Sequence, residues 1–293
     1  MNGILLIDKP EGWTSMDVCA KLRGALREKR IGHSGTLDPM ATGLLVVFLG
    51  RATRAVEFAE ADEKTYQAAL RLGITTDTQD VSGTVLSEVP VSVTDGALEA
   101  AFEKFRGEID QLPPMYSAIK VKGQKLYDIA RRGGEVERVP RRISVYGIDI
   151  LGKEGNDRRL DISCSKGTYI RTLCHDIGAS LGCGGCMSAL RRTQAGSFRI
   201  ENAHTLAEVQ RAADEGRAEE LLLPIDTLFA DRPAYTADAA QEKKLRVGAA
   251  VSAAPADGEY RVYSAGGEFL LLGKAENGEL KTVKSFFEVE NDR

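Results

Sequence analysis

Long apolar runs are missing from this sequence of 293 residues. The longest one, Leu44 to Leu49, is far shorter than the roughly 20 residues that a membrane-spanning helix needs. The first residues carry neither a basic leader nor a cleavable apolar segment. We therefore expect no membrane partner and a cytoplasmic location.

Cysteines are also few: the chain has five, an odd number. An intracellular chain of this size needs no disulfide scaffold, so we expect reduced thiols. Cys183 and Cys186 have the redox spacing C-x-x-C, but no second cysteine pair accompanies them. They also precede a Leu-Arg-Arg segment instead of opening a helix after a strand, so we expect neither a metal site nor a redox function.

An excess of positive charge is lacking as well, because 39 Lys and Arg face 43 Asp and Glu, for a net charge of −4. That balance argues against a nucleic-acid partner, but the charges are unevenly spread. Residues 120–142 carry eight basic and three acidic side chains, whereas residues 201–226 carry two arginines and seven acids. A basic stripe is typical of phosphate binding, and the alternative for this segment is a solvated charged face.

The composition, 43% hydrophobic and 28% charged, is enough to bury a core, and the length fits one large domain or one large and one small domain. Apolar alternation and short apolar runs predict strands at about 3–8, 42–49, 65–72, 142–151 and 159–165. Capping boxes predict helices after Thr14 and Thr205, and periodicity predicts others at about 52–61, 95–106 and 170–181. Beyond a linker at 231–233, a helix and several short strands indicate a small barrel.

Residues 32–43, GHSGTLDPMATG, fit no ordinary helix or strand pattern. Three glycines free the backbone to turn or to approach a ligand, while Pro39 pushes Asp38 into an extended conformation. A carboxylate held on such a stiffened loop, beside a His, a Ser and a Thr, can be a nucleophile, a general base, a metal ligand or only a turn former. The spacing alone leaves these alternatives open.

Residues 111–133 form a second unusual segment. Two prolines at 113 and 114 open it, a short strand to Lys122 and a turn at Gly123 follow, and a short helix ends at Gly133-Gly134. Basic side chains are mixed with apolar ones along it. A basic insertion of this kind suits docking into a folded RNA.

Several blocks of the sequence together resemble the bacterial tRNA pseudouridine-55 synthases, the TruB family. The blocks occur in the order of that family: ILLIDKPEGWTS (4–15), GHSGTLDPMATG (32–43), GRATR (50–54), KTY (64–66), QLPPMYSAIKVKGQKLYDIARRG (111–133), SKGTYIRTLCHDIG (165–178) and ALRRTQAGSF (189–198). The resemblance is strong to residue 198 and weaker beyond it. Cys186 departs from the pattern, because the family commonly has His there.

The resemblance implies a mixed α/β (α+β) fold with two domains. Residues 1–232 would form the catalytic domain, on a central, mainly antiparallel sheet flanked by helices, with an RNA-docking insertion at about 111–140. Residues 233–293 would form a PUA-like RNA-binding β-barrel. The implied reaction is the isomerisation of uridine 55 in the T-loop of tRNA to pseudouridine, on a flipped-out base and without a cofactor. The implied enzyme is a monomer that binds the T-arm and the acceptor end and uses no guide RNA.

The resemblance also assigns residues. Asp38 matches the catalytic aspartate, Tyr66 the tyrosine that stacks on the flipped base and handles a proton, and Arg171 the partner of Asp38. His33 matches the residue that holds the flipped T-loop, and Tyr169 a second aromatic wall. Further substrate contacts are expected from Lys9, Lys120, Lys122, Arg132 and Leu190.

Three rival interpretations remain. A non-catalytic tRNA-binding or tRNA-folding protein of the same fold would not need Asp38, Tyr66 and Arg171 together, and all three are present. A carboxylate hydrolase would need a second, paired carboxylate, and nothing near the Asp38 loop marks one. A guide-RNA-dependent relative is the third, and the intact segment 111–133 resembles the stand-alone bacterial form instead.

Overall fold

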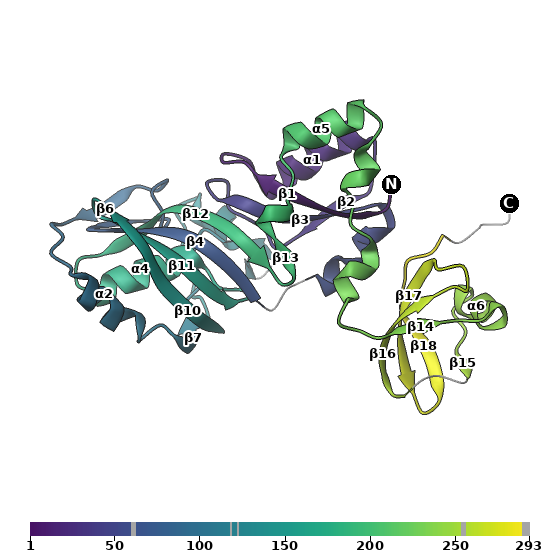
Figure 1. Ribbon diagram of the computed structural model, residues 1–293. Helices are drawn as coiled ribbons and strands as arrows, with labels where there is room; N and C mark the ends of the chain where they lie inside the picture. Colours follow the sequence, from purple (N-terminus) through teal and green to yellow (C-terminus); the bar gives the residue numbers. More distant parts are fainter. Residues whose placement is uncertain (60–62, 118, 122, 253–255, 289–293) are drawn as a thin grey trace.

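A computed structural model describes residues 1–59, 63–117, 119–121, 123–252 and 256–288. Its centre is a nine-stranded sheet, mainly antiparallel, with the path β1-β3-β12-β4-β11-β10-β7 (Figure 1). In that order the strands are Gly3–Lys9, Thr42–Leu49, Gly185–Ala195, Glu63–Leu72, Asp157–Ser165, Arg141–Glu154 and Gly107–Gln111. β2 (Ile31–Ser34) pairs with β3, and β13 (Phe198–Arg199) with β12. The expected mixed α/β class is confirmed.

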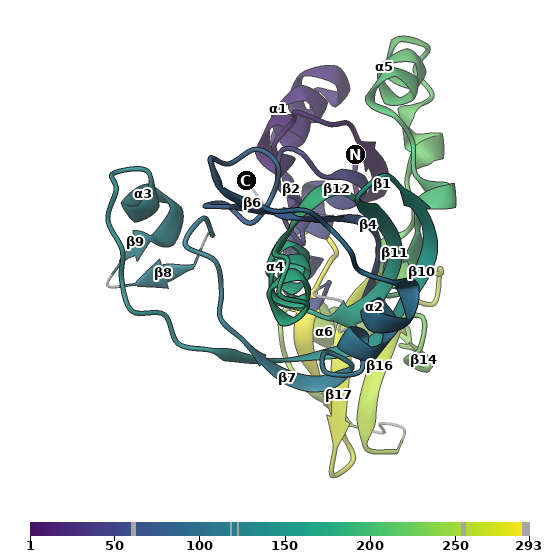
Figure 2. The same ribbon diagram turned by 90° about the vertical axis from the view of Figure 1, so that its left-hand side faces the viewer.

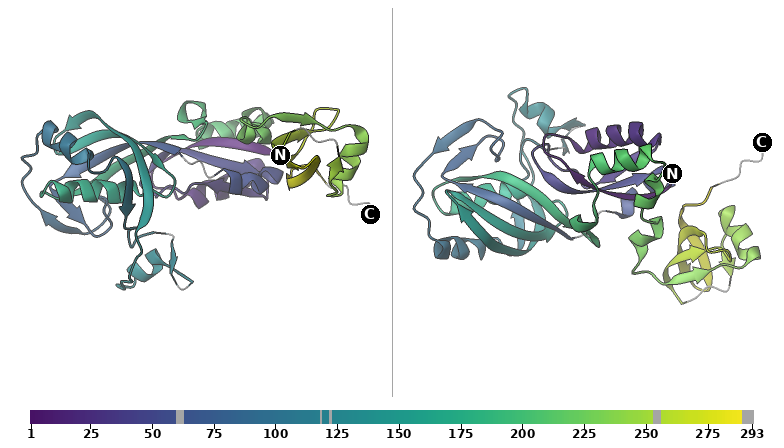
Figure 3. Two further views of the ribbon diagram at one scale, coloured as in Figure 1. Left: turned by 90° about the horizontal axis from the view of Figure 1, so that it is seen from below. Right: turned by 45° about the horizontal axis from the view of Figure 1, so that its top comes forward.

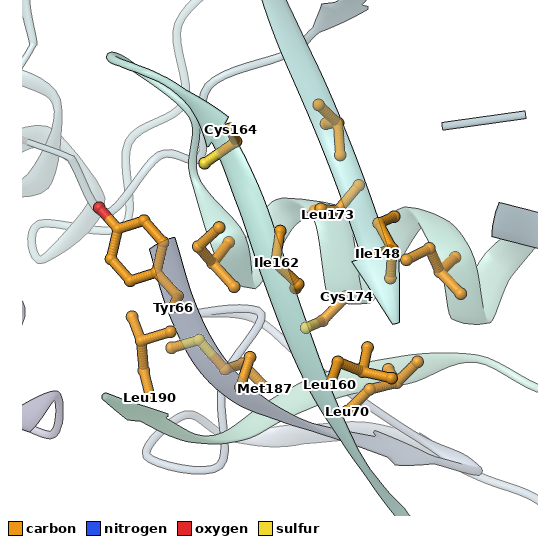
Figure 4. Close-up of a cluster of buried hydrophobic side chains, with 14 of the residues drawn as sticks. Tyr66, Leu70, Ile148, Leu160, Ile162, Cys164, Leu173, Cys174, Met187 and Leu190 are labelled. Carbon is orange, nitrogen blue, oxygen red and sulfur yellow. The ribbon is translucent and has the colours of Figure 1, made fainter. Parts of the chain in front are cut away.

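Helices cover one face of this sheet in two groups. α1 (Ser15–Leu26) and α5 (Leu206–Asp214) pack over the β1–β3 half through a core that includes Leu5, Ile7 and Val47. α4 (Ile170–Ser180) and α2 (Asp95–Phe102) pack over the other half, on the cluster drawn in Figure 4. The middle of the face lies between the two groups.

The chain between β7 and β10 leaves the sheet. This insertion holds β8 (Lys120–Val121), β9 (Gln124–Lys125) and α3 (Leu126–Ala130). Figures 2 and 3 show it standing away from the body of the molecule. The strand, turn and helix predicted for 111–133 are thus present, as a two-stranded hairpin followed by one short helix.

A smaller five-stranded sheet occupies the C-terminal part, in the order β14-β16-β17-β18-β15. Its strands are Ala234–Thr236, Gly258–Tyr263, Phe269–Glu276, Glu279–Ser285 and Val251–Ser252, and α6 (Ala239–Arg246) packs beside it. The remaining elements are the hairpin β5 (Ile74–Thr76) and β6 (Val85–Glu88), and the 3-10 helices η1 (Gly50–Phe58), η2 (Ile200–Asn202), η3 (Ala218–Leu221) and η4 (Ile225–Phe229).

Local predictions have mixed outcomes. Both capping boxes are present, at Thr14 and at Thr205. The segment at 52–61 was predicted as a helix and is the 3-10 helix η1, because its apolar residues Ala52, Ala55 and Phe58 recur every three residues. Residues 32–34, predicted to lie outside any strand, belong to β2. No helix in the described ranges is long and apolar enough to cross a bilayer.

Candidate active site

One lateral row of residues crosses the middle of the sheet, where the two groups of helices separate. Lys9 in β1 is paired with Gly43 in β3, Gly43 with Arg192 in β12, and Arg192 with Tyr66 in β4. Laterally paired residues point to the same face of a sheet, so two cations flank a glycine here. A Cβ at Gly43 would collide with the backbone of Arg192, and its φ of +95° also favours glycine. The loop 35–41 begins after β2 and ends at this row.

Two side chains and one backbone amide hold this loop on both sides of Asp38. The Ser15 hydroxyl accepts from the Leu37 amide at 3.0 Å and donates to the Leu37 carbonyl at 3.3 Å. The Lys9 ammonium donates to the Pro39 carbonyl at 3.3 Å. The Pro39 carbonyl also accepts from the Gly12 amide at 2.8 Å. The carboxylate of Asp38 is therefore carried on a fixed piece of backbone, while 38% of its side chain stays exposed.

Arg171, in the first turn of α4, reaches Asp38. Its Nη2 lies 3.4 Å from Asp38 Oδ2 and donates to the carbonyl oxygen of Tyr116 at 2.6 Å. Its Nη1 lies 3.6 Å from Asp80 Oδ2. The pairing expected between Arg171 and Asp38 is thus present, but it is an ion pair through one nitrogen and not a bidentate fork, because the guanidinium is divided among three acceptors.

Asp80 is a residue of this site that sequence reasoning missed. The segment 74–83 is rich in turn formers and was predicted to be scaffold. It turns back onto β12, where the Val81 amide donates to the Met187 carbonyl and the Met187 amide donates to the Gln79 carbonyl, and this pairing carries Asp80 to Arg171. Asp80 is 3% exposed, and its Oδ1 accepts from Ser82 N and Thr78 Oγ1, both at 2.9 Å. Turn chemistry around Asp80 was visible in the sequence, but its tertiary partner was not.

The charges around Asp38 oppose one another. Burial raises the pKa of the Asp38 carboxyl above its ordinary value, the Arg171 guanidinium lowers it, the Asp80 carboxylate raises it, and the Lys9 ammonium lowers it. Burial is the largest effect, so the net direction is upward. The carboxyl is a stronger base than a solvent-exposed aspartate and needs its cations to stay ionised.

Tyr66 lies at the end of the apolar cluster that also contains Leu37, Ala41 and Leu190. In Figure 4 its ring packs beside Leu190, while its hydroxyl points away from the aliphatic side chains. Burial raises the pKa of the phenol, and the Arg192 guanidinium opposes that rise. The expected juxtaposition of Tyr66, Leu190 and the Asp38 loop is therefore present.

Two further residues assigned from the sequence lie at the rim. Tyr169 caps α4, and Arg171 sits over its ring at 5.9 Å. The amide of Gln111, at the root of the insertion, bonds the Tyr169 N–H at 2.8 Å and the Tyr169 carbonyl at 3.1 Å. His33 lies in β2, and its buried Nδ1 has no protein partner among the described residues. Burial, followed by the Arg192 charge, lowers the His33 pKa, so its imidazole is neutral near pH 7.

Lys9 does not fit its expected role as a substrate contact. The residue is fully buried, and its ammonium donates to the carbonyls of Pro10 at 3.0 Å, Trp13 at 2.6 Å and Pro39 at 3.3 Å. A cation that uses its donors on backbone carbonyls cannot reach an RNA phosphate. Lys9 joins two loops beneath the site instead.

Lys120 and Arg132, two of the basic residues expected to contact RNA, belong to the insertion. Lys120 begins β8, and Arg132 is exposed after α3. Lys122 lies outside the described residues. The insertion touches the site through its backbone, at the Tyr116 carbonyl that binds Arg171.

Comparison with known families agrees with this geometry. Residues 23–170 match the model described as "TruB family pseudouridylate synthase (N terminal domain)", and residues 171–230 match "tRNA pseudouridylate synthase B C-terminal domain". Among curated relatives, a tRNA pseudouridine synthase B of Ralstonia pickettii is 47% identical over 84% of this chain and 78% of its own length. Those of Azoarcus sp. and Clostridium kluyveri are 44% and 41% identical, over 96% and 98% of this chain and 93% and 100% of their own lengths.

Solved structures give the same result. The fold matches a Cbf5-Nop10-Gar1 complex with a TM-score of 0.74 at 28% identity, over 98% of this chain and 85% of that one. It matches an H/ACA RNP bound to a substrate RNA containing 2'-deoxyuridine with a TM-score of 0.73 at 26% identity, over 98% of this chain and 86% of that one. With its catalytic blocks, sheet and relatives all in agreement, the chain belongs to the TruB family of pseudouridylate synthases.

Proposed function

We propose that this chain isomerises uridine 55 in the T-loop of tRNA to pseudouridine, with Asp38 as the nucleophile and without a cofactor. The observation that carries the assignment of Asp38 is its setting. It is a partly exposed carboxylate on a loop held on both sides, paired with one arginine, and its loop packs on the buried apolar cluster that contains Tyr66. Such a carboxylate is fixed in direction and open to a substrate.

The reaction sets the chemical requirements. The N1–C1' bond of the nucleotide must break, the uracil must rotate, and a C5–C1' bond must form, after which C5 loses its proton and N1 gains one. A nucleophile, a group that handles a proton, and a site closed to water are needed. Asp38 supplies the first.

Arg171 and Asp80 set the charge of Asp38 in this proposal. Arg171 favours the carboxylate that attacks, and Asp80 keeps Arg171 oriented through an ion pair at 3.6 Å. Because a flipped uridine would close the site further, desolvation of Asp38 would grow on binding, and the arginine becomes more important.

Tyr66, Tyr169 and Leu190 would form the walls around the flipped base, with the Tyr66 hydroxyl available for the proton steps. His33, neutral and with a free Nδ1 in the described chain, would hold the displaced loop of the RNA by a hydrogen bond. Extraction of a stacked base costs a few kcal/mol, and these contacts would offset it.

The insertion and the C-terminal sheet would grip the tRNA away from the base. Lys120, Lys122 and Arg132 are the candidates for phosphate contacts in the insertion, and the C-terminal sheet, proposed as a PUA-like domain of residues 233–293, for the acceptor end. We propose that the chain acts as a cytoplasmic monomer without a guide RNA, since the insertion is complete and relatives named tRNA pseudouridine synthase B match it nearly end to end.

Tritium release from a tRNA transcript labelled at uridine C5, incubated with the protein alone, tests this function. The proposal expects release of one equivalent per tRNA, and none from a transcript with cytidine at position 55. Asp38→Asn should abolish release while tRNA binding stays nearly intact, because the change removes charge and nucleophilicity and keeps the shape. Release only after a second RNA is added would mean a guide-dependent enzyme, and turnover of Asp38→Asn within about tenfold of the wild type would remove Asp38 from its role.

A further inference from the structure

Arg192 is a buried cation that none of the roles above uses. It is 1% exposed, in the middle of β12, and it lies between Gly43 of β3 and Tyr66 of β4 in the row that crosses the sheet. Arginine is almost never fully buried in a protein unless it is paired. In the described part of the chain this guanidinium forms no ion pair with a carboxylate, so its position calls for another reason.

Its hydrogen bonds go to both ends of the Asp38 loop. Nε donates to the carbonyl of Leu44 at 2.8 Å, and Nη2 donates to the carbonyl of Gly35 at 2.8 Å. The ten-residue span from Gly35 to Leu44 is thus closed by one planar group. Nη1 remains on the side of Gly35, where a Cβ would lie only 3.1 Å from it.

The phenol of Tyr66 is the polar group beside this charge. Tyr66 and Arg192 are direct neighbours across β4 and β12, both buried and both on the face that carries the site. The guanidinium lowers the pKa of the phenol, against the larger opposing effect of burial. A fixed cation next to a buried phenol favours the phenolate over the same phenol in an apolar pocket.

We propose that Arg192 is a positioning residue for the isomerisation that acts through Tyr66: held in place by its bonds to Gly35 and Leu44, its charge lets Tyr66 give up and regain a proton. This inference rests on the proposed function. The proton balance is complete within the site. Tyr66 gives its phenolic proton to the N1 anion of the detached uracil and becomes a phenolate. When C5 then attacks C1', the bond between C1' and the Asp38 carboxylate breaks, and the phenolate takes the proton from C5 and becomes a phenol again. Arg192 stabilises the phenolate between the two transfers.

Single-turnover rates of four proteins test the proposal: wild type, Arg192→Gln, Tyr66→Phe and the double variant. Gln removes the charge and can still donate to one carbonyl. We expect Arg192→Gln to slow the chemical step by roughly 10²-fold, the scale of one lost electrostatic donor, while the Kd for tRNA changes much less. The double variant should be no slower than Tyr66→Phe alone, because residues that act through each other are not additive. Arg192→Lys, which keeps the charge, should recover most of the lost rate.

Arg191→Gln is the matched control, since Arg191 is the next residue on β12 and binds Asp8 through the opposite face of the sheet. Its rate should stay near that of the wild type. If Arg192→Gln and Tyr66→Phe multiply in the double variant, or if Arg192→Lys is as slow as Arg192→Gln, Arg192 only supports the fold and the proposal is wrong. If Tyr66→Phe has no effect, the proton-transfer role of Tyr66 in the proposed function is wrong. If the wild type does not isomerise uridine in tRNA, the proposed function itself is wrong.

Discussion

Arg171 is shared between two carboxylates, and this sharing limits how far it can lower the pKa of Asp38. A guanidinium bound bidentately to Asp38 would keep that carboxyl ionised down to low pH. Instead Arg171 lies 3.4 Å from Asp38 and 3.6 Å from Asp80, and its shortest hydrogen bond goes to a backbone carbonyl. Burial raises the pKa of Asp38 above its ordinary value, and the shared Arg171 opposes that rise only in part. The acid limb of the pH–rate profile should therefore lie above the pH at which an exposed aspartate titrates.

Two substitutions should move this limb in opposite directions. Arg171→Lys weakens the stabilisation of the carboxylate, raises the pKa of Asp38 and moves the acid limb upward. Asp80→Asn removes a like charge, lowers the pKa of Asp38 and moves the limb downward, although it also releases Arg171 and slows the reaction, by roughly tenfold or more. Single-turnover rates across pH measure both.

Arg142→Lys is the control for the first substitution, because Arg142 pairs with Asp110 on the exposed side of β7 and β10. Its profile should match that of the wild type. If Arg171→Lys and Asp80→Asn shift the limb in the same direction, or not at all, Arg171 and Asp80 orient groups without setting the charge of Asp38.

Lys9 leads to a prediction about stability. Burial lowers its pKa from 10.5 to about 8 in the folded chain. Between these pH values the unfolded chain holds a proton that the folded chain has released, so folding stability rises with pH in that window. The unfolding free energy of the wild type minus that of Lys9→Met should thus rise from pH 8 toward 10.5, by up to about 1.4 kcal/mol per pH unit. Urea denaturation of both proteins across this range measures it, and a flat difference would show that the three carbonyl bonds keep Lys9 protonated.

At the scale of single residues, the sequence could indicate which side chains take part in the reaction. It could not indicate which residues pair across strands. Asp38, Tyr66 and Arg171 were found because each lies in a block that resembles the family. Asp80 and Arg192 were not, since an Asp among turn formers and an Arg in a Leu-Arg-Arg segment look like surface residues. Lys9 was expected to contact the substrate because it lies in a block that resembles the family, and its burial was not visible in the sequence. The places of Asp80, Arg192 and Lys9 in the site depend on burial and on pairing across strands. Both depend on contacts between residues distant in sequence.

At the scale of elements, sequence signals that span a few residues predicted helix starts and strand faces. The capping boxes at Thr14 and Thr205 set the helix starts, because the bonds involved span three residues. The alternation from Tyr66 to Leu72 gave β4 and its buried face. The return of Asp80 to β12 could not be predicted, because it depends on pairing with Met187, a residue about 100 positions away.

The insertion is the element with a testable electrostatic role. If its cations contact phosphates, replacing Lys120, Lys122 and Arg132 with Gln should weaken tRNA binding and flatten its salt dependence, by roughly 0.7–0.9 units of slope per lost contact. Binding measured at several salt concentrations gives the slope. Lys104, Lys153 and Arg159 are exposed on the catalytic sheet and its helices, and their replacement with Gln is the matched control. Equal slopes for both triple variants would make the insertion a solvated face.

At the scale of the whole molecule, the two sheets share a core. Phe229 of η4 lies 5.6 Å from Phe58 of η1 and 5.9 Å from Phe286 after β18, measured between ring centroids. The same cluster contains Val46 of the catalytic sheet and Leu272 of the smaller one. Polar contacts border it, including Lys284 with Glu57 at 2.5 Å. The C-terminal sheet is thus joined to the catalytic part by side-chain packing as well as by the chain.

Deleting residues 234–293 should have two separate effects. Affinity for tRNA should fall more than the rate of the chemical step, if this part grips the acceptor end. The melting temperature should also fall, because the deletion uncovers Phe58 and Phe229, and a buried Phe contributes about 1.5–3 kcal/mol. Calorimetry and single-turnover rates at low temperature separate the two. A truncated protein with unchanged melting temperature would show that the aromatic cluster adds no stability.

The aromatic cluster around Phe229 also holds the C-terminal sheet at one distance from the active site. Because packed cores do not deform continuously, the distance from Asp38 to the outer strands of the C-terminal sheet is set by the fold. A substrate held at both points must present its target uridine and its distant end at that one separation. An RNA whose stem is two base pairs longer could not bind at both points at once. The enzyme would therefore select its substrate by length even where the loop sequence is correct.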